Sequence, residues 1–207
     1  MRKARSRVLV YPHHSLAQWS EGPPDVERAR PASCPCCEQP SRPVGRALNV
    51  IGHGLRDRMQ VGPPEPGGEP AELTIRLRRY LCRACGAVLE VVPATVAAGR
   101  RYTTTAVAWA LALFCIEKRS AAAVRERVAP GRRFGATAAA GWAQLRRWVR
   151  AVRARTLFAV VRAAPATWTC RQIAERAAST LASWAPPEMR ATHGLGVQAW
   201  HGALRAR

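Results

Sequence analysis

Two Cys-x-x-Cys motifs constrain this chain more than any other feature of its sequence. Residues 34–37 read Cys-Pro-Cys-Cys, and residues 82–85 read Cys-Arg-Ala-Cys. A gap of two residues lets both sulfurs of a motif reach one ion, and two such pairs are the ligand set of a tetrahedral Zn²⁺ site. Four thiolates leave no open position for water, so we expect one structural Zn²⁺ ion. The predicted ligands are Cys34, Cys37, Cys82 and Cys85.

The first motif is less regular than the second. Cys36 lies inside it and could replace a neighbouring ligand, and His53, between the two motifs, is a weaker alternative. Glu38 follows the first motif, whereas Gly86 follows the second and supplies a permissive backbone. The sequence therefore leaves the exact ligand choice of the first motif open.

The cysteine count and the short apolar runs favour a protein of a reducing compartment. The total of seven cysteines is odd, which argues against a disulfide framework, and paired Cys-x-x-Cys motifs in the cytoplasm indicate metal binding. The basic start of the chain is followed by only four apolar residues, 8–11, too few for a signal peptide. The longest apolar run, 106–116, is too short to span a bilayer. We expect a cytoplasmic protein with no membrane partner.

The pattern along the chain predicts an α+β fold: a small antiparallel zinc-ribbon sheet followed by a mainly helical, helix-turn-helix-like domain. Proline-rich residues 1–33 are predicted to be a flexible segment. Residues 34–98 are predicted to form the zinc ribbon and residues 99–165 the helical domain. Residues 166–207 are expected to form a C-terminal helix and tail.

Three strands are predicted in the ribbon, at 47–51, 73–81 and 87–92, with a loop at 61–70. Leu73, Ile75, Leu77 and Leu81 alternate with polar residues, and we place Tyr80 on the polar face. Such a small sheet has little core, so the metal is expected to supply most of its stability.

Four helices are predicted after the ribbon. Thr103 to Thr105 offer N-cap hydroxyls for a helix that ends near Lys118, and Ser120 can cap residues 121–128. Further helices are expected at 138–155 and 169–184, and residues 188–207 are expected to form a tail with at most a short helix. The third helix has one apolar face: Trp142, Leu145, Val149 and Val152.

Charge indicates a polyanionic partner. Residues 1–99 carry 14 basic and 9 acidic side chains, a net charge of +5, and residues 100–207 carry 19 and 4, a net charge of +15. Such a field favours nucleic acid, and a helix with arginines opposite an apolar face can lie in a major groove. A GC-rich coding sequence or an ordinary solvated basic face would also account for the arginines. The predicted DNA contacts are Arg76, Arg78, Arg83, Arg101, Arg132, Arg133, Arg146, Arg147, Arg150 and Arg153.

The scarcity of acidic residues argues against a catalytic function. The chain has only two aspartates, Asp25 and Asp57, whereas a two-metal nuclease core needs clustered carboxylates. It also lacks a P-loop. We expect a protein that is not an enzyme.

The spacing of these motifs resembles a known family. Cys-Pro-x-Cys, a strand ending in Cys82-x-x-Cys85-Gly86, a short strand ending in proline, and Arg101-Tyr102-Thr103 before a helix are similar to the N-terminal head of certain insertion-sequence transposases. They are also similar to short stand-alone bacterial proteins of unknown function that keep this head without the catalytic domain. The similarity covers residues 34–118.

The resemblance implies that the four predicted cysteines bind zinc and that residues 101–103 join the ribbon to a DNA-binding part. The expected function is binding of double-stranded DNA in a mobile element, with a transposase or other protein of that element as a further partner. One alternative is a protein-interaction module that docks on a polymerase or transposase. Another is an inactive transposase fragment. The irregular first motif and the long connection before the third helix depart from the pattern.

Overall fold

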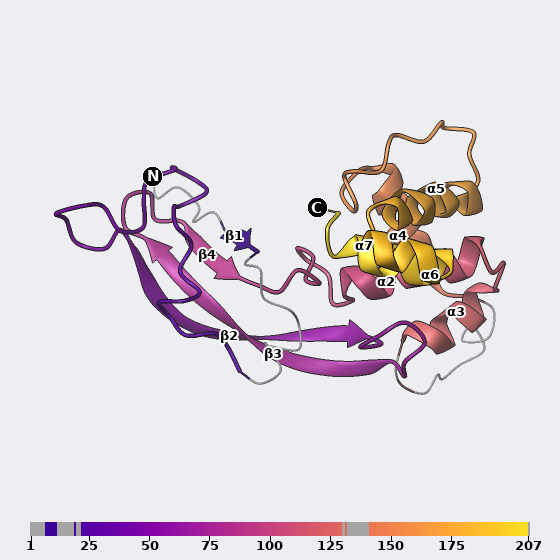
Figure 1. The fold of residues 1–207 in the computed structure, drawn as a ribbon, viewed down its shortest axis with the longest axis horizontal. Coiled ribbons are helices and arrows are strands. Elements are labelled where there is room, and N and C mark those ends of the chain that lie inside the picture. Colours follow the sequence, from indigo (N-terminus) through magenta and orange to yellow (C-terminus); the bar gives the residue numbers. More distant parts are fainter. Residues whose placement is uncertain (1–6, 12–18, 20–21, 130, 132–140, 207) are drawn as a thin grey trace. The chain divides into compact units, whose positions relative to one another are not determined.

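The computed structural model contains a four-stranded sheet and, in the residues that it describes, six α-helices (Figure 1). It describes all residues except 1–6, 12–18, 20–21, 130, 132–140 and 207. The α+β class predicted from the sequence is therefore confirmed. The chain divides into two compact units: unit 1 is Met1–Met59 with Thr74–Ala98, and unit 2 is Gln60–Leu73 with Gly99–Arg207.

The sheet is mixed rather than wholly antiparallel. Its strands are β1 (Arg7–Val10), β2 (Val50–Gly62), β3 (Ala71–Cys82) and β4 (Val88–Val91), in the order β1-β4-β3-β2. β3 pairs antiparallel with β4, but β1 pairs parallel with β4 on its other side. The prediction of a purely antiparallel sheet was wrong because residues 7–10, assigned to a flexible segment, supply a strand.

The hairpin of β2 and β3 is longer than the sequence predicts. β2 begins at Val50 and runs for 13 residues, whereas the predicted strand covered 47–51. Most of its residues are exposed or only half-buried, and they include Gly52, Gly54 and Asp57. A strand of this kind has no clear hydrophobic period, so its length cannot be predicted from the sequence pattern.

β3 follows the predicted alternation only in part. Ile75 and Leu77 are buried as expected, but Leu73 is 37% exposed. Tyr80, predicted on the polar face, is fully buried, and its hydroxyl donates a hydrogen bond of 2.7 Å to the carbonyl of Val26. Burial raises the pKa of Tyr80 to about 12. The placement of Tyr80 was wrong because residues before the first cysteine motif cover this face of the sheet.

Three helices of unit 2 begin at a hydroxyl cap, as predicted for Thr103 and Ser120. Thr103 accepts from the N–H of Ala106, Ser120 caps the next helix, and Thr169 forms a capping box with Gln172. The first helix ends earlier than predicted, because Lys118 has a φ of 53° in the left-handed region. The helices are α2 (Thr104–Cys115), α3 (Ala121–Val128), α4 (Ala143–Arg153) and α5 (Cys170–Ser183).

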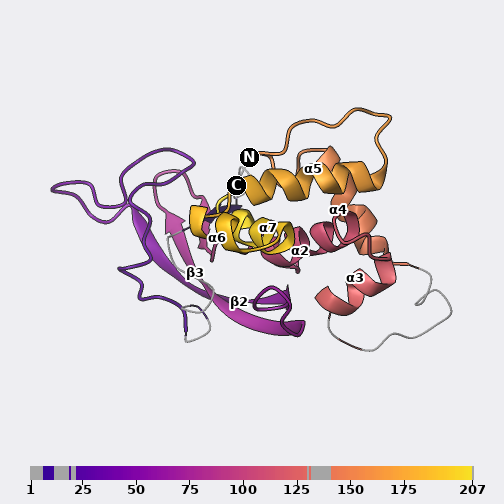
Figure 2. The ribbon, with the colours of Figure 1, turned by 45° about the vertical axis from the view of Figure 1, so that its right-hand side comes forward.

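The core of unit 2 forms around α2, whose residues are buried on almost every side. Figures 1 and 2 show α2 beside α5 and α7, and the three helices pack against one another. The apolar face predicted for the third helix is confirmed, because Trp142, Leu145, Val149 and Val152 are all buried. Trp148, fully buried on the same helix, stacks edge-on against Trp142 at 4.9 Å between ring centroids.

Residues 188–207 do not form the predicted tail. They carry most of α6 (Pro187–Thr192) and all of α7 (Leu195–Ala203), and α7 packs on both α2 and α5. Trp200 and Ala203 are buried in the core of unit 2. Gly202 lies against the last turn of α5, where a Cβ atom would overlap the carbonyl oxygen of Leu181. The end of the described chain is therefore an integral part of this unit.

Candidate metal centre

Four cysteine sulfurs from the two motifs lie together in unit 1. The Sγ atoms of Cys34 and Cys85 are 3.7 Å apart, as are those of Cys37 and Cys82, and all four lie within 4.8 Å of one another. An ion at the centre of a regular tetrahedron, with metal–sulfur bonds of about 2.3 Å, would separate its sulfurs by about 3.8 Å. The four cysteines could therefore hold one metal ion, and they are the four predicted from the sequence.

The two motifs form the same backbone turn. In each, the N–H of the first cysteine donates to the carbonyl of the residue five positions later, and the N–H four positions later donates back to that cysteine's carbonyl. These distances are 2.9 and 2.7 Å around Cys34, and 2.9 and 2.8 Å around Cys82. Glu38 and Gly86, at the equivalent position, have φ of 59° and 75°. The sequence irregularity at Glu38 thus leaves the geometry of the first turn unchanged.

We expect Glu38→Gly to raise the free energy of unfolding of unit 1 by about 1 kcal/mol. An L-residue in the left-handed region is strained by about 1–2 kcal/mol, and glycine is not. Denaturant unfolding of the metal-loaded chain, followed by hydrogen exchange in β3 and β4, would measure the change. Glu38→Gln removes the charge but keeps the Cβ, so it should bring no gain. Equal stability of the Gly and Gln variants would contradict this explanation.

Asn49 connects the two turns by hydrogen bonds, a role that no sequence pattern predicts. Its side-chain carbonyl accepts from the N–H of Ala84 at 3.0 Å, and its backbone carbonyl accepts from the N–H of Arg83 at 2.8 Å. Its own N–H donates to Ser41, just after the first turn, at 3.0 Å. One residue therefore braces both halves of the centre.

The local electrostatics differ among the thiols. Burial acts to raise the pKa of Cys34, but the N–H groups of Cys36 and Cys37 and the neighbouring thiols outweigh it, and the pKa is lowered. For Cys85 the N–H of Ala87 acts to lower the pKa, but burial and contacts with the other three thiols raise it to about 12. A divalent cation would relieve this crowding by stabilising all four thiolates. With four sulfurs around one centre, the arrangement suits a structural ion.

The other two candidate ligands stand apart from this group. Cys36 is exposed, and its side chain is not one of the four that converge. His53 lies on β2 and is also outside the group. The ambiguity in the first motif is resolved by geometry, because the two-residue gap brings Cys34 and Cys37 to the same point.

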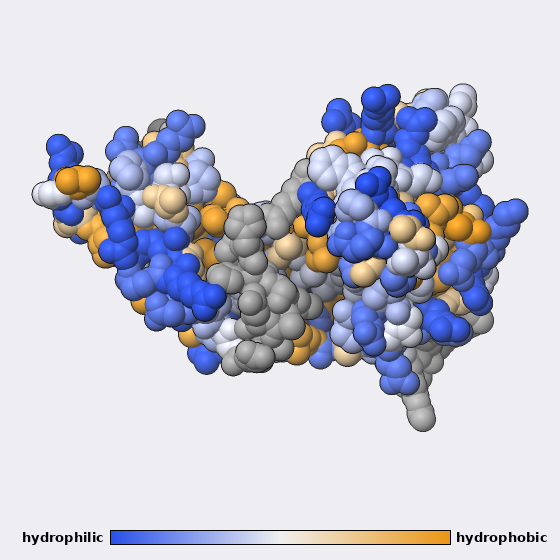
Figure 3. Space-filling view, viewed as in Figure 1, coloured by the Kyte–Doolittle hydropathy of each residue, from blue (hydrophilic) through white to orange (hydrophobic). Residues whose placement is uncertain are grey.

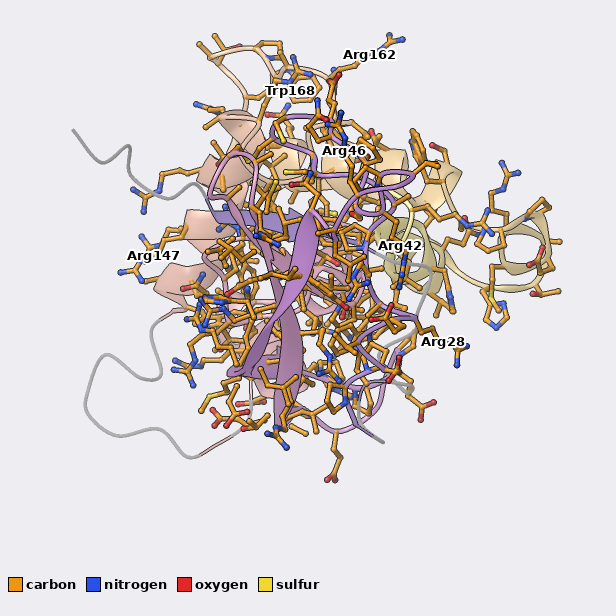
Figure 4. All side chains as sticks on the ribbon, turned by 90° about the vertical axis from the view of Figure 1, so that its left-hand side faces the viewer. Arg28, Arg42, Arg46, Arg147, Arg162 and Trp168 are labelled. Carbon is orange, nitrogen blue, oxygen red and sulfur yellow. The ribbon has the colours of Figure 1, made fainter. Side chains whose placement is uncertain are left out.

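The predicted DNA-contacting arginines fall into separate groups. Those of α4 are exposed along one side of the helix, opposite its buried face, and Figure 4 shows Arg147 pointing away from the ribbon. Hydrophilic side chains cover much of the visible face of unit 2 (Figure 3). The exposed arginines of α4 are Arg146, Arg147, Arg150 and Arg153. Of these, Arg153 also donates from Nη2 to the carbonyl of Trp168.

Four of the predicted arginines outside α4 lie in the described residues, and three of these have partners within the protein. Arg78 donates from Nε and Nη2 to the carbonyl of Pro24, at 3.1 and 2.8 Å. Arg76 pairs with Asp57 at 3.7 Å. Arg101 pairs with Glu72 at 3.4 Å. Arg83 is exposed in the second cysteine motif. Arg132 and Arg133 lie outside the described residues.

A buried carboxylate in unit 1 was also missed. Glu90 on β4 is 1% exposed, and its Oε1 lies 3.2 Å from Nη1 of Arg56 and 4.0 Å from Nε of Arg79. Both arginines come from the neighbouring hairpin, so the three side chains form an internal group of opposite charges. The sequence signal that could have indicated this ion pair is a single acidic residue in an apolar strand that follows an arginine-rich strand.

Comparisons with protein-family models, with curated proteins and with solved structures give no match to this chain. In the part of the chain that the structure describes, no helix combines the length and the apolar character needed to cross a membrane.

Proposed function

We propose that this protein binds double-stranded DNA through α4 and uses one structural Zn²⁺ ion to hold unit 1 together. The single observation that carries the proposal is the division of α4 into two faces. Leu145, Trp148 and Val149 are at most 2% exposed, so the helix is firmly seated. Its opposite side presents four arginines, and the helix contains no acidic residue.

The helices around α4 support a helix-turn-helix-like arrangement. α2 packs against both α3 and α4, and side chains of all three join one hydrophobic core. Arg125 of α3 donates to the carbonyl of Gly141, at 3.3 Å, immediately before α4. A supported helix with an exposed arginine face can lie in a major groove, where guanidinium groups bind phosphates and guanine edges.

Zinc is the proposed ion because four thiolates in tetrahedral spacing are its usual structural ligand set. A closed site of this kind does not activate water, so the proposed role is binding and not catalysis. The resemblance of residues 34–118 to transposase heads supports a setting in a mobile element, as a transposase-related or regulatory protein.

The test is affinity for a duplex as a function of salt. Each phosphate contact contributes about 0.9 to the slope of log K against log salt, so the wild-type chain should show a steep slope. Arg146→Ala with Arg150→Ala should lower the slope by up to about 2 and weaken binding more than tenfold at moderate salt. Arg190→Ala removes an exposed arginine of α6 and serves as the charge control.

Two outcomes would refute the proposal. One is a wild-type chain that binds no duplex at low salt. The other is a double variant that behaves as Arg190→Ala does, which would remove α4 from the interface. Co-purification of a stoichiometric protein without nucleic acid would instead favour a protein-interaction module.

A further inference from the structure

A short loop in unit 1 is held rigidly beside the metal centre. Residues 42–48 are closed at their base by a hydrogen bond of 3.0 Å from the N–H of Asn49 to the carbonyl of Ser41. Ser41 is 2% exposed, and its N–H and hydroxyl donate to the carbonyls of Ala32 and Pro31. Asn49 also accepts from two N–H groups of the second cysteine turn. Both ends of the loop are therefore fixed to the metal centre.

The tip of the loop is a β-turn. The N–H of Arg46 bonds to the carbonyl of Pro43 at 3.3 Å, and Gly45 has a φ of 67°, which this turn position needs and glycine adopts without strain. Val44, at the tip, is 99% exposed. A partner that covers this apolar side chain removes it from water, which favours binding. Because the turn is already fixed, little conformational entropy is lost on binding.

Arginines flank this apolar tip on both sides. No acidic residue occurs between Glu38 and Asp57 in the sequence. Arg42 pairs with Glu27. Among the residues that the structure describes, no carboxylate lies within ion-pair distance of Arg46. Figure 4 labels both arginines on the loop. We call residues 42–46 the Arg42–Arg46 turn.

We propose that the Arg42–Arg46 turn enters the minor groove of A·T-rich duplex DNA. This inference rests on the proposed function and adds a second contact, made by unit 1. A narrow minor groove concentrates negative potential and attracts inserted arginines, and minor-groove proteins also place apolar side chains between base steps. Arg46 would lie in the groove and Val44 would contact a base step, while Arg42 keeps its pairing with Glu27.

The chemistry of the tip favours nucleic acid over a protein surface. A protein partner for Val44 would need an apolar pocket with carboxylates on both sides. The minor groove offers the same combination along its whole length: phosphates on both walls and base edges at its floor. It is about 6 Å wide, which admits a turn but not a helix.

The test compares two duplexes of equal length, one with a central A-tract and one of G·C pairs, at fixed salt. The wild-type chain should prefer the A-tract duplex by about tenfold. Arg46→Ala should lower A-tract affinity by about that factor and bring the preference close to one. Arg190→Ala should leave the preference unchanged. Val44→Ser should reduce the bend of the bound duplex, measured by energy transfer between its labelled ends.

The outcomes separate this inference from the proposed function. Absence of any duplex binding by the wild-type chain refutes both. Salt-dependent binding that needs Arg146 and Arg150, but has no A-tract preference and no response to Arg46→Ala, overturns the minor-groove contact alone. The minor-groove contact is also overturned if Val44→Ser abolishes binding to a protein partner while the affinities for both duplexes stay at the wild-type value.

Discussion

Cys82→Ser is expected to unfold unit 1 while the helices of unit 2 stay folded. Cys82 is fully buried, and its Sγ lies 3.7 Å from that of Cys37. Removing one of four thiolates opens the coordination sphere and sharply weakens binding. In small zinc domains the ion supplies about 10–16 kcal/mol, which is most of the folding free energy. The sheet of unit 1 has a small core and cannot replace that contribution.

Hydrogen exchange on the full chain can follow the two units separately. Peptides from β3 and β4 should lose protection in Cys82→Ser, while peptides from α5 and α7 keep theirs. Elemental analysis should find about one zinc per wild-type chain and none in the variant. Cys36→Ser is the matched control, because Cys36 lies outside the group of four and should leave the metal content unchanged. Full zinc content and unchanged protection in Cys82→Ser would contradict the four-thiolate centre.

Gly202→Ala is expected to destabilise unit 2 by about 3 kcal/mol or more. A Cβ at this position would overlap the carbonyl oxygen of Leu181 and lie 2.7 Å from its carbonyl carbon. The obstructing atoms are backbone, so α7 would have to move away from α5 and open the core between them. Overpacking usually costs 1–3 kcal/mol, and a forced helix displacement belongs at the upper end of that range.

Thermal unfolding followed by helical circular dichroism would measure this effect. For a chain of this size, a loss of 3 kcal/mol lowers Tm by about 6–12 °C. Gly194→Ala, at the N-cap of the same helix, has no atom within 4 Å of the new Cβ and an ordinary φ of −68°. Its Tm should stay near that of the wild type. A similar Tm for both variants would show that the α5–α7 contact is looser than described.

The metal centre was accessible from the sequence because its signal is local. A two-residue gap fixes each pair of thiols within one turn, and only the meeting of the two pairs depends on the fold. The brace at Asn49 and the burial of Glu90 depend on contacts between segments more than 30 residues apart in the chain. No spacing rule reports such contacts. The burial of Tyr80 could not be predicted for the same reason, because it depends on a contact with Val26.

The helices divide along similar lines. Those with a hydroxyl cap or an apolar stripe were predicted, since each of these signals lies within one element. α7 has neither a side-chain cap nor a typical helical composition. It contains Gly196 and Gly202, which lower helix propensity but allow close approach to Trp109 and to α5. Here the tertiary contact requires the residues that make the helix hard to recognise.

The discontinuous division of the chain has a practical consequence. Residues 60–73 lie between two parts of unit 1 in the sequence, yet they belong to unit 2. Val61 bonds to residues on either side of Tyr102, and Gly62 packs closely against Ala106. A gene fragment that starts at residue 99 would leave out this strand segment and expose the first turn of α2. The helical part therefore cannot be cloned, or exchanged between proteins, by a single cut after residue 98 without losing part of its own structure.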